Sequence, residues 1–351
     1  MKLHDIRSLV SFNRPARSVP ERLDRHVHSI EDMRVRAARR LPRSVFDYIE
    51  GGSEDEVSLR RNRASFEDWE FIPRWGSIDN LTLSSTLLGG PVSMPLLLSP
   101  TGGTRLFHPD GELATARGAS AAKAVMVVSS DSSFPIDKIA AEAKAGLWYQ
   151  AFPGADANAL KSQIQQAVKA GCKAVCITVG AEYRDAKRAS GPAQLAKMAP
   201  AALNWNVIDQ LRQGLSVPFV LKGIMSSEEA DAAIKHGVQG IVVSDYGSLL
   251  TKGMAPAIEV LPSIVDAVGG RVPVLVDGSF RRGSDVFKAL AFGATAVMIG
   301  RPAMWGLAAY GADGVQSVVE MLQTDLGRDL GQCGTPTLKA ISRAHVKVHQ
   351  V

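Results

Sequence analysis

Two short segments near the end of the chain carry the residue types that bind a phosphate group. Residues 277–283 read Asp-Gly-Ser-Phe-Arg-Arg-Gly, and residues 300–302 read Gly-Arg-Pro. Glycines let backbone N–H groups approach an anion, and a guanidinium offers a forked pair of donors that matches phosphate. The two segments therefore predict a phosphate site. The alternative interpretation is that Arg281 and Arg301 form surface salt bridges.

Each segment follows a short apolar run, and six more such runs occur upstream, each followed by a helical pattern. The eight runs lie at 96–99, 125–129, 147–152, 174–179, 219–222, 240–244, 274–277 and 296–300. Continuous apolar strands that alternate with helices predict a parallel sheet, and eight units close an α/β (β/α)8 TIM barrel. An open doubly wound sheet is the alternative.

The remaining elements have readable boundaries. Residues 1–75 are predicted to form an N-terminal helical extension with a helix over about 30–51, and residues 76–351 form the barrel. Ser226 opens one barrel helix and Gly237 closes it, while Arg282 to Asp285 open another. Gly51 and Gly52 are interpreted as a helix stop and not as a phosphate-binding loop, because no strand precedes them.

Composition indicates an ordinary globular protein, with 46% hydrophobic and 21% charged residues and a net charge of +5. The basic excess lies largely at 34–43, a predicted solvated helix face without the interleaved aromatics that stack on nucleic acid bases. Three cysteines are too few for a disulfide framework. We expect a cytoplasmic protein with no membrane span, no nucleic-acid partner and, from the histidine spacing, no metal.

Enzymes of this fold carry their sites at the carboxyl ends of the strands. The polar residues at these ends suit a cofactor lying across the barrel mouth, and they are Thr101, Ser129, Gln150, Thr178, Lys222, Ser244, Asp277 and Arg301.

A resemblance narrows the prediction. The segment 274–302, VLVDGSFRRGSDVFKALAFGATAVMIGRP, is similar to the FMN-dependent 2-hydroxy-acid oxidases and dehydrogenases of the glycolate oxidase and lactate oxidase type. The resemblance continues through 41–48, 94–112, 128–133 and 220–223, so it spans nearly the whole chain, with one much shorter segment. It implies a flavoprotein that acts on a small molecule and forms a homo-oligomer, as a tetramer of barrels.

The resemblance also implies an FMN site. Lys222 would lie near the flavin N1 and O2 atoms, where a cation stabilises the negative charge of the reduced ring. The implied cofactor-binding residues are Pro100, Thr101, Gly102, Ser129, Gln150, Thr178, Lys222 and Ser244 around the ring, and Asp277, Gly278, Ser279, Arg281, Gly300 and Arg301 around the ribityl phosphate.

The chain departs from the family on the substrate side. After the sixth strand the family reads Ser-Asn-His-Gly, with an arginine two residues later, whereas residues 244–249 here read Ser-Asp-Tyr-Gly-Ser-Leu. In the family the histidine takes the substrate hydroxyl proton and the arginine binds the substrate carboxylate. Tyr246 and Leu249 cannot repeat these roles, because a phenol has a reference pKa near about 10 and leucine binds no anion.

Other departures agree with this loss. The family's aspartate that orients the histidine aligns with Gly180, and its active-site tyrosine aligns with Phe152. A further family arginine aligns with Lys187 or Arg188, which would close over an anion or face water.

Two hypotheses follow. In the first, the chain is an FMN-dependent oxidoreductase for a substrate other than a simple 2-hydroxy acid, such as an amine or a carbon acid, with Tyr246 as a donor or acid and Tyr48 facing it. In the second, it is a non-catalytic FMN-binding scaffold. Asp131 could bind a cationic substrate or act as a base, or be a solvated loop residue. His108 is interpreted as part of a turn before a helix.

Overall fold

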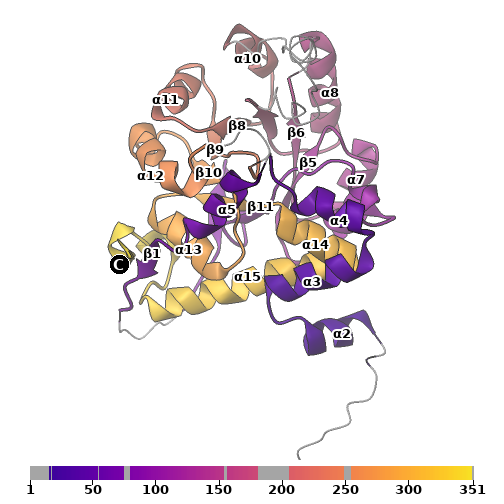
Figure 1. Cartoon of the computed structure of the whole chain (residues 1–351). Helices are drawn as coiled ribbons and strands as arrows, with labels where there is room; N and C mark the ends of the chain where they lie inside the picture. Colours follow the sequence, from indigo (N-terminus) through magenta and orange to yellow (C-terminus); the bar gives the residue numbers. More distant parts are fainter. Residues whose placement is uncertain are drawn as a thin grey trace, which may run out of the picture.

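Eight parallel strands close into a barrel at the centre of the molecule. The computed structural model describes residues 16, 18–53, 55–74, 80–153, 156–180, 205–248 and 254–349. The barrel order is β10-β11-β4-β5-β6-β7-β8-β9 (Figure 1). The strands are β4 (Leu96–Leu98), β5 (Val125–Ser129), β6 (Leu147–Ala151), β7 (Val175–Thr178), β8 (Phe219–Ile224), β9 (Gly240–Val243), β10 (Val274–Val276) and β11 (Ala296–Ile299). The predicted (β/α)8 barrel is confirmed, and the doubly wound alternative is wrong.

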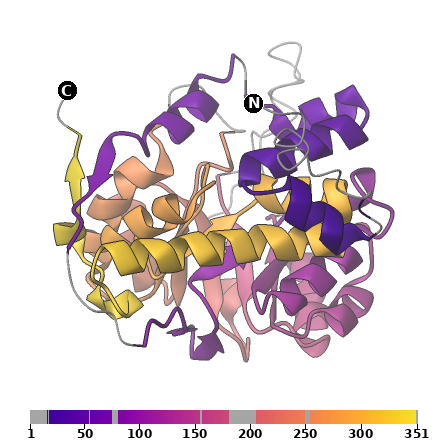
Figure 2. The ribbon, with the colours of Figure 1, turned by 90° about the horizontal axis from the view of Figure 1, so that it is seen from below.

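Helices cover the outside of the barrel, as the alternating pattern predicted (Figure 1). They are α6 (Gly111–Ala121), α7 (Ile136–Glu142), α8 (Ala157–Lys169), α10 (Trp205–Arg212), α11 (Ser227–Lys235), α12 (Ala257–Val268), α13 (Gly283–Ala291), α14 (Arg301–Tyr310) and α15 (Ala312–Gln332). Figure 2 shows the 21-residue α15 crossing the molecule, where it packs against α6, α13 and α14. Ser226 caps α11 by accepting a hydrogen bond from the Glu229 N–H at 3.2 Å, as the sequence predicted.

The N-terminal extension consists of four helices in the described part of the chain. They are α2 (Val19–His26), α3 (Ile30–Arg40), α4 (Arg43–Glu50) and α5 (Val57–Ala64). The single helix predicted over 30–51 is wrong, because the chain is extended at Leu41 and Pro42. Proline lacks an N–H and forces the preceding residue out of helical conformation, which separates α3 from α4. Gly51 ends α4, as predicted.

Two small sheets complete the fold. The hairpin of β2 (Ser85–Leu87) and β3 (Gly90–Val92) places Leu87 in the apolar cluster inside the barrel, at the end opposite the mouth. Near the chain ends, β1 (Trp69–Phe71) pairs antiparallel with β12 (Val346–Val348). All three cysteines, which the sequence analysis judged too few for a disulfide framework, are free and buried. Among the described residues, no helix is long and apolar enough to cross a membrane.

Candidate active site

The polar residues at the carboxyl ends of adjacent strands form two hydrogen-bonded sets around the mouth. Lys222, at the end of β8, is only 4% exposed, and its Nζ lies 2.7 Å from Asp277 Oδ2 after β10. The same ammonium donates to Ser244 Oγ after β9. On the other side, Gln150 of β6 donates from Nε2 to Thr178 Oγ1 of β7 at 2.8 Å. The structure therefore brings Lys222, Ser244 and Asp277 together, and Gln150 and Thr178 together, among the residues that the sequence singled out.

Two acceptor atoms in these two sets are buried without a hydrogen-bond donor among the described residues. They are Gln150 Oε1 and Asp277 Oδ1. A buried acceptor that lacks a donor is destabilising by about 1–3 kcal/mol, so such atoms point to a ligand or to water. Each oxygen suits an N–H or O–H group of a molecule held in the mouth.

Arg281 is a partly buried cation without an acidic partner. Its Nη1 donates to the Phe280 carbonyl at 2.8 Å, and its guanidinium lies 4.5 Å from the centre of the Trp305 ring. No carboxylate in the described part of the chain lies within salt-bridge distance of it. Burial, followed by repulsion from Arg301 and Arg63, lowers the pKa of Arg281 to about 9. A phosphate in contact with Arg281 would relieve both effects.

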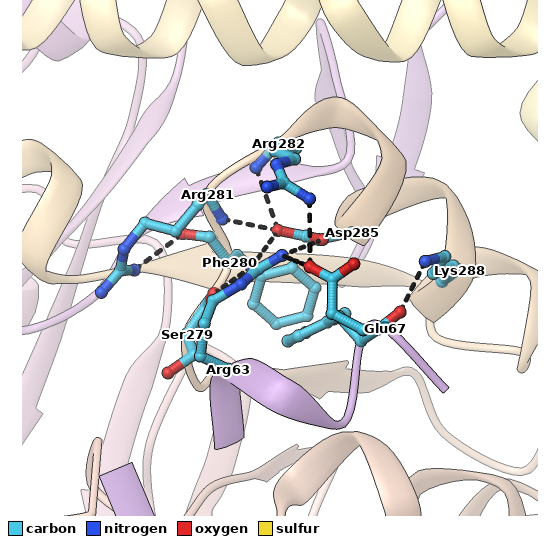
Figure 3. Close-up of polar contacts among 9 residues, drawn as sticks. Arg63, Glu67, Ser279, Phe280, Arg281, Arg282, Asp285 and Lys288 are labelled. Atoms are coloured by element: carbon cyan, nitrogen blue, oxygen red, sulfur yellow. Dashed lines mark hydrogen bonds and ion pairs between the residues drawn. The ribbon is translucent and has the colours of Figure 1, made fainter. Parts of the chain in front are cut away.

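Asp285 occupies the N-terminus of α13, so of the two helix starts near Arg281 only that of α14 is open to an anion. Its Oδ2 accepts the backbone N–H groups of Arg281 and Arg282 at 2.8 and 3.0 Å, and it pairs with Arg63 of α5 (Figure 3). The start of α13 is thus already capped by a carboxylate. By contrast, α14 begins directly after Gly300 without a side-chain cap. The uncapped start of α14 is therefore the helix end that can offer N–H groups to a phosphate.

The loop that carries Ser279 is held from the N-terminal extension. Gly278 and Ser279 have φ values of +113° and +57°, a conformation that glycine adopts without strain. Arg63 donates from Nη1 to the Ser279 carbonyl at 2.9 Å, as Figure 3 shows. Sequence reasoning missed Arg63, and nothing in its surroundings distinguishes it from the neighbouring arginines of α5.

Arg301 makes contacts that the sequence did not predict. Its Nε donates to the Ile49 carbonyl at 2.8 Å, and its Nη2 donates to the carbonyls of Gly51 and Gly247 at 3.0 and 3.1 Å. The guanidinium thus joins the end of α4 to the loop after β9. Burial lowers the pKa of Arg301. Neither Arg281 nor Arg301 forms a salt bridge with a described residue, so the alternative interpretation as surface ion pairs finds no support in this part of the chain.

The loop after β4 lies against the loop after β5. Pro100 and Thr101 are partly exposed, and a Cβ on Gly102 would lie 2.7 Å from the Asp131 Cβ, so only glycine fits there. Asp131 is exposed, and its N–H donates to Ser129 Oγ at 3.2 Å. These residues therefore reach the mouth from the side opposite Lys222.

Tyr246, which the sequence aligns with the family's histidine, fills a space next to two glycines. Its φ is +60°, and its N–H donates to Ser244 Oγ at 3.2 Å. The ring centre lies 5.2 Å from Lys222 Nζ. A Cβ on Gly223 would overlap Tyr246 Oη, and a Cβ on Gly180 would lie 3.6 Å from it. The phenol thus packs over the ends of β7 and β8.

Other predicted residues lie apart from these two sets or outside the described residues. Tyr48, on α4, is 63% exposed, and its ring centre lies 6.4 Å from that of Phe107. His108 accepts the Asp110 N–H at Nδ1, which agrees with its interpretation as a turn residue. Lys187, Arg188 and Leu249 lie outside the described residues.

The donor and acceptor set at the mouth fits FMN. The ring of a flavin carries an N–H donor and carbonyl acceptors, its ribityl chain carries hydroxyls, and its tail is a phosphate. The free acceptors Gln150 Oε1 and Asp277 Oδ1 suit the ring N–H and the ribityl hydroxyls. Arg281 and the start of α14 suit the phosphate. Lys222 would supply a cation near the ring.

Comparisons with known proteins agree with this chemistry. The family model described as FMN-dependent dehydrogenase matches residues 37–191 and 180–348. A peroxisomal (S)-2-hydroxy-acid oxidase of Oryza sativa subsp. japonica is 37% identical, over 91% of this chain and 95% of its own. The human 2-hydroxyacid oxidase 1 is 35% identical, over 91% and 96%. A crystal structure of mandelate oxidase with (S)-2-phenylpropionate superposes with a TM-score of 0.86 at 35% identity, over 92% and 99%.

A (β/α)8 barrel whose mouth offers a buried ammonium and unpaired acceptors suits a flavin-dependent oxidoreductase, and the comparisons show that class. The chain belongs to the FMN-dependent 2-hydroxy-acid oxidase family, and FMN is its cofactor.

Proposed function

We propose that the chain oxidises a substrate other than a simple 2-hydroxy acid by transferring a hydride to FMN. The observation that carries this proposal is the packing of Tyr246 over Gly180 and Gly223. At the base position the chain has a phenol, and at the position of the orienting aspartate it has a glycine. A substrate hydroxyl would therefore find no imidazole to take its proton.

The cofactor side of the site supports retained catalysis. When bound, FMN accepts the two electrons that leave the substrate. Lys222 would stabilise the negative charge that the ring acquires, and the Asp277 carboxylate holds Lys222 in place at 2.7 Å. A protein that only binds FMN does not need this buried ion pair beside the ring. For this reason we favour an enzyme over a scaffold.

On the substrate side, we assign Tyr246 as a hydrogen-bond donor or acid. We propose Tyr48, which is exposed on α4, as a second hydroxyl that would face a bound substrate. Asp131, which reaches the mouth next to Gly102, would attract a cationic substrate or serve as a base. These roles suit an amine or a carbon acid better than a carboxylate, because the leucine at position 249 supplies no positive charge for an anion.

The test is anaerobic reduction of the bound flavin by candidate substrates, measured as the loss of the visible absorbance of the flavin. We expect no bleaching by glycolate, lactate or mandelate, and bleaching by members of an amine or carbon-acid panel. A variant that combines Tyr246→His, Gly180→Asp and Leu249→Arg restores the three family residues, and we expect it to gain bleaching by a 2-hydroxy acid. Rapid bleaching of the unaltered protein by lactate would refute the proposal, whereas no bleaching by any panel member would favour the scaffold.

Two further properties stay proposals. We propose a homo-oligomer, to be tested by light scattering of the purified protein. We also propose a cytoplasmic location, although the rice relative is named as peroxisomal, and fluorescence microscopy of a tagged chain would distinguish the two.

A further inference from the structure

The loop after β9 holds a buried carboxyl that the proposed reaction does not use. Asp245 is 1% exposed, and it stands where the family motif has a neutral asparagine. Its Oδ2 accepts from Asn62 Nδ2 and, at 3.0 Å, from Ser248 Oγ. Its Oδ1 accepts the Gly247 N–H at 3.1 Å. All of these partners are neutral, and no cation in the described part of the chain lies within salt-bridge distance of Asp245.

A second carboxylate lies next to Asp245. A Cβ on Gly278 would be 3.7 Å from Asp245 Oδ1, so Asp245 borders the loop that begins with Asp277. Asp277 already pairs with Lys222, the cation of the ring site. Lys222 also donates to Ser244, the residue before Asp245. The Lys222 ammonium thus pairs with Asp277, whereas Asp245 on the neighbouring loop has no ion-pair partner in the described part of the chain.

The groups that face Asp245 come from four elements. Lys222 of β8 and Arg301 of α14 favour its charged form, Asp277 after β10 disfavours it, and Asn62 of α5 is neutral. Burial is the largest effect and raises the pKa of Asp245, and the charge of Asp277 raises it further. Burial and the Asp277 charge therefore both favour the neutral form of this carboxyl, and a new negative charge nearby would favour protonation further.

Reduction of a flavin next to Lys222 brings such a charge. We propose that Asp245 takes up a proton when the bound flavin is reduced, so that this carboxyl links the reduction potential of the protein to pH. In the balanced step the oxidised ring takes two electrons and one proton from the reductant and becomes an anion. The Asp245 carboxylate takes one further proton from solvent and becomes a neutral acid.

The test is the reduction potential of the FMN-loaded protein, measured with a slow enzymatic reductant and a reference dye. A two-electron, one-proton step changes the potential by about 30 mV per pH unit, and a second proton raises the slope to about 59 mV. Because the pKa of Asp245 is raised, we expect the unaltered protein to have a steeper interval, above the usual carboxyl range, between two shallow ones. Asp245→Asn should keep the shallow slope throughout.

The two proteins should also separate in a defined direction. At low pH their potentials should coincide, because Asp245 is neutral in both redox forms. Above the steep interval the unaltered protein should lie lower by at least about 30 mV, a tenfold change in the two-electron equilibrium. Ser248→Ala removes one donor to the carboxylate without changing charge, so it should move the steep interval to higher pH.

A single shallow slope in the unaltered protein would overturn the proposal, and this result needs no variant to fold. A steep interval that persists in Asp245→Asn would assign the proton to another group and also overturn it. Because the reductant is not the substrate, the result depends on flavin binding and not on the proposed substrate class. If the proposed substrate class were refuted, the expected slopes of the reduction potential against pH would not change.

Discussion

Replacing Arg281 by methionine should change two properties in opposite directions. In the flavin-free protein Arg281 is a cation whose pKa is lowered to about 9 by burial and by the neighbouring arginines. At neutral pH, where the guanidinium is charged in both the folded and the unfolded protein, this lowering corresponds to a destabilisation of at most about 5 kcal/mol. Methionine also loses the hydrogen bond to the Phe280 carbonyl and the contact with Trp305, together about 2–3 kcal/mol. We therefore expect Arg281→Met to stabilise the flavin-free protein by up to about 2 kcal/mol.

The same change should weaken FMN binding. Two charge-assisted hydrogen bonds between a guanidinium and a phosphate contribute about 3 kcal/mol or more, which is at least roughly a 100-fold change in the dissociation constant. Titration of flavin fluorescence measures this constant, and urea denaturation of the flavin-free protein measures stability. Riboflavin, which lacks the phosphate, should bind Arg281→Met and the unaltered protein equally.

A matched control lies next in the chain. Arg282 is 61% exposed and pairs with Glu67 at 3.1 Å, so Arg282→Met should change neither property appreciably. Equal weakening of FMN and riboflavin by Arg281→Met would refute the phosphate assignment. A less stable flavin-free variant would refute the reasoning about the unpaired cation.

Three further predictions concern the ring site and the outer helices. Lys222→Met leaves the Asp277 carboxylate buried and unpaired, so urea denaturation should show a loss of about 3–5 kcal/mol, most of it recovered in the double variant with Asp277→Asn; no recovery would contradict the pairing. Tyr246→Phe should leave flavin absorbance unchanged but slow flavin reduction by the substrate roughly 100-fold in stopped-flow measurements, and an unchanged rate would remove its proposed role. Burial, with a contribution from Asp325, raises the pKa of Asp329 to about 6, above its unfolded value of 3.8. The charged form thus destabilises the fold above that pH, so Asp329→Asn should stabilise the protein by about 1–2 kcal/mol at pH 7 and by nothing below about pH 4 in denaturation measurements.

The sequence predicted the barrel because its signals are local. Each strand is an apolar run of a few residues, and each helix has a start or stop that a short window contains, as at Ser226 and Gly237. The phosphate loops were readable for the same reason, since residues 277–283 and 300–302 follow their strands directly. The broken helix at Pro42 was also a local signal, and the prediction over 30–51 overlooked it.

The rest of the site depends on pairs that are far apart in the sequence. Asn62 meets Asp245 across 183 positions, and Arg63 meets Asp285 across 222. No local pattern in an arginine-rich helix indicates which of its side chains turns inward. The space that Tyr246 fills likewise depends on Gly180 and Gly223, which belong to two other strand ends.

The pairing of β1 with β12 has a consequence for synthesis on the ribosome. Trp69 lies opposite Val348, so the first strand stays unpaired until nearly the whole chain has emerged. The contacts of Arg63 with Asp285 and of Arg301 with Ile49 likewise cannot form until the later residue of each pair has been synthesised. Nascent chains generally fold from the N-terminus, but here the N-terminal extension completes its folding after the barrel. The extension is synthesised before the barrel strands, but it docks after them, once β12 pairs with β1.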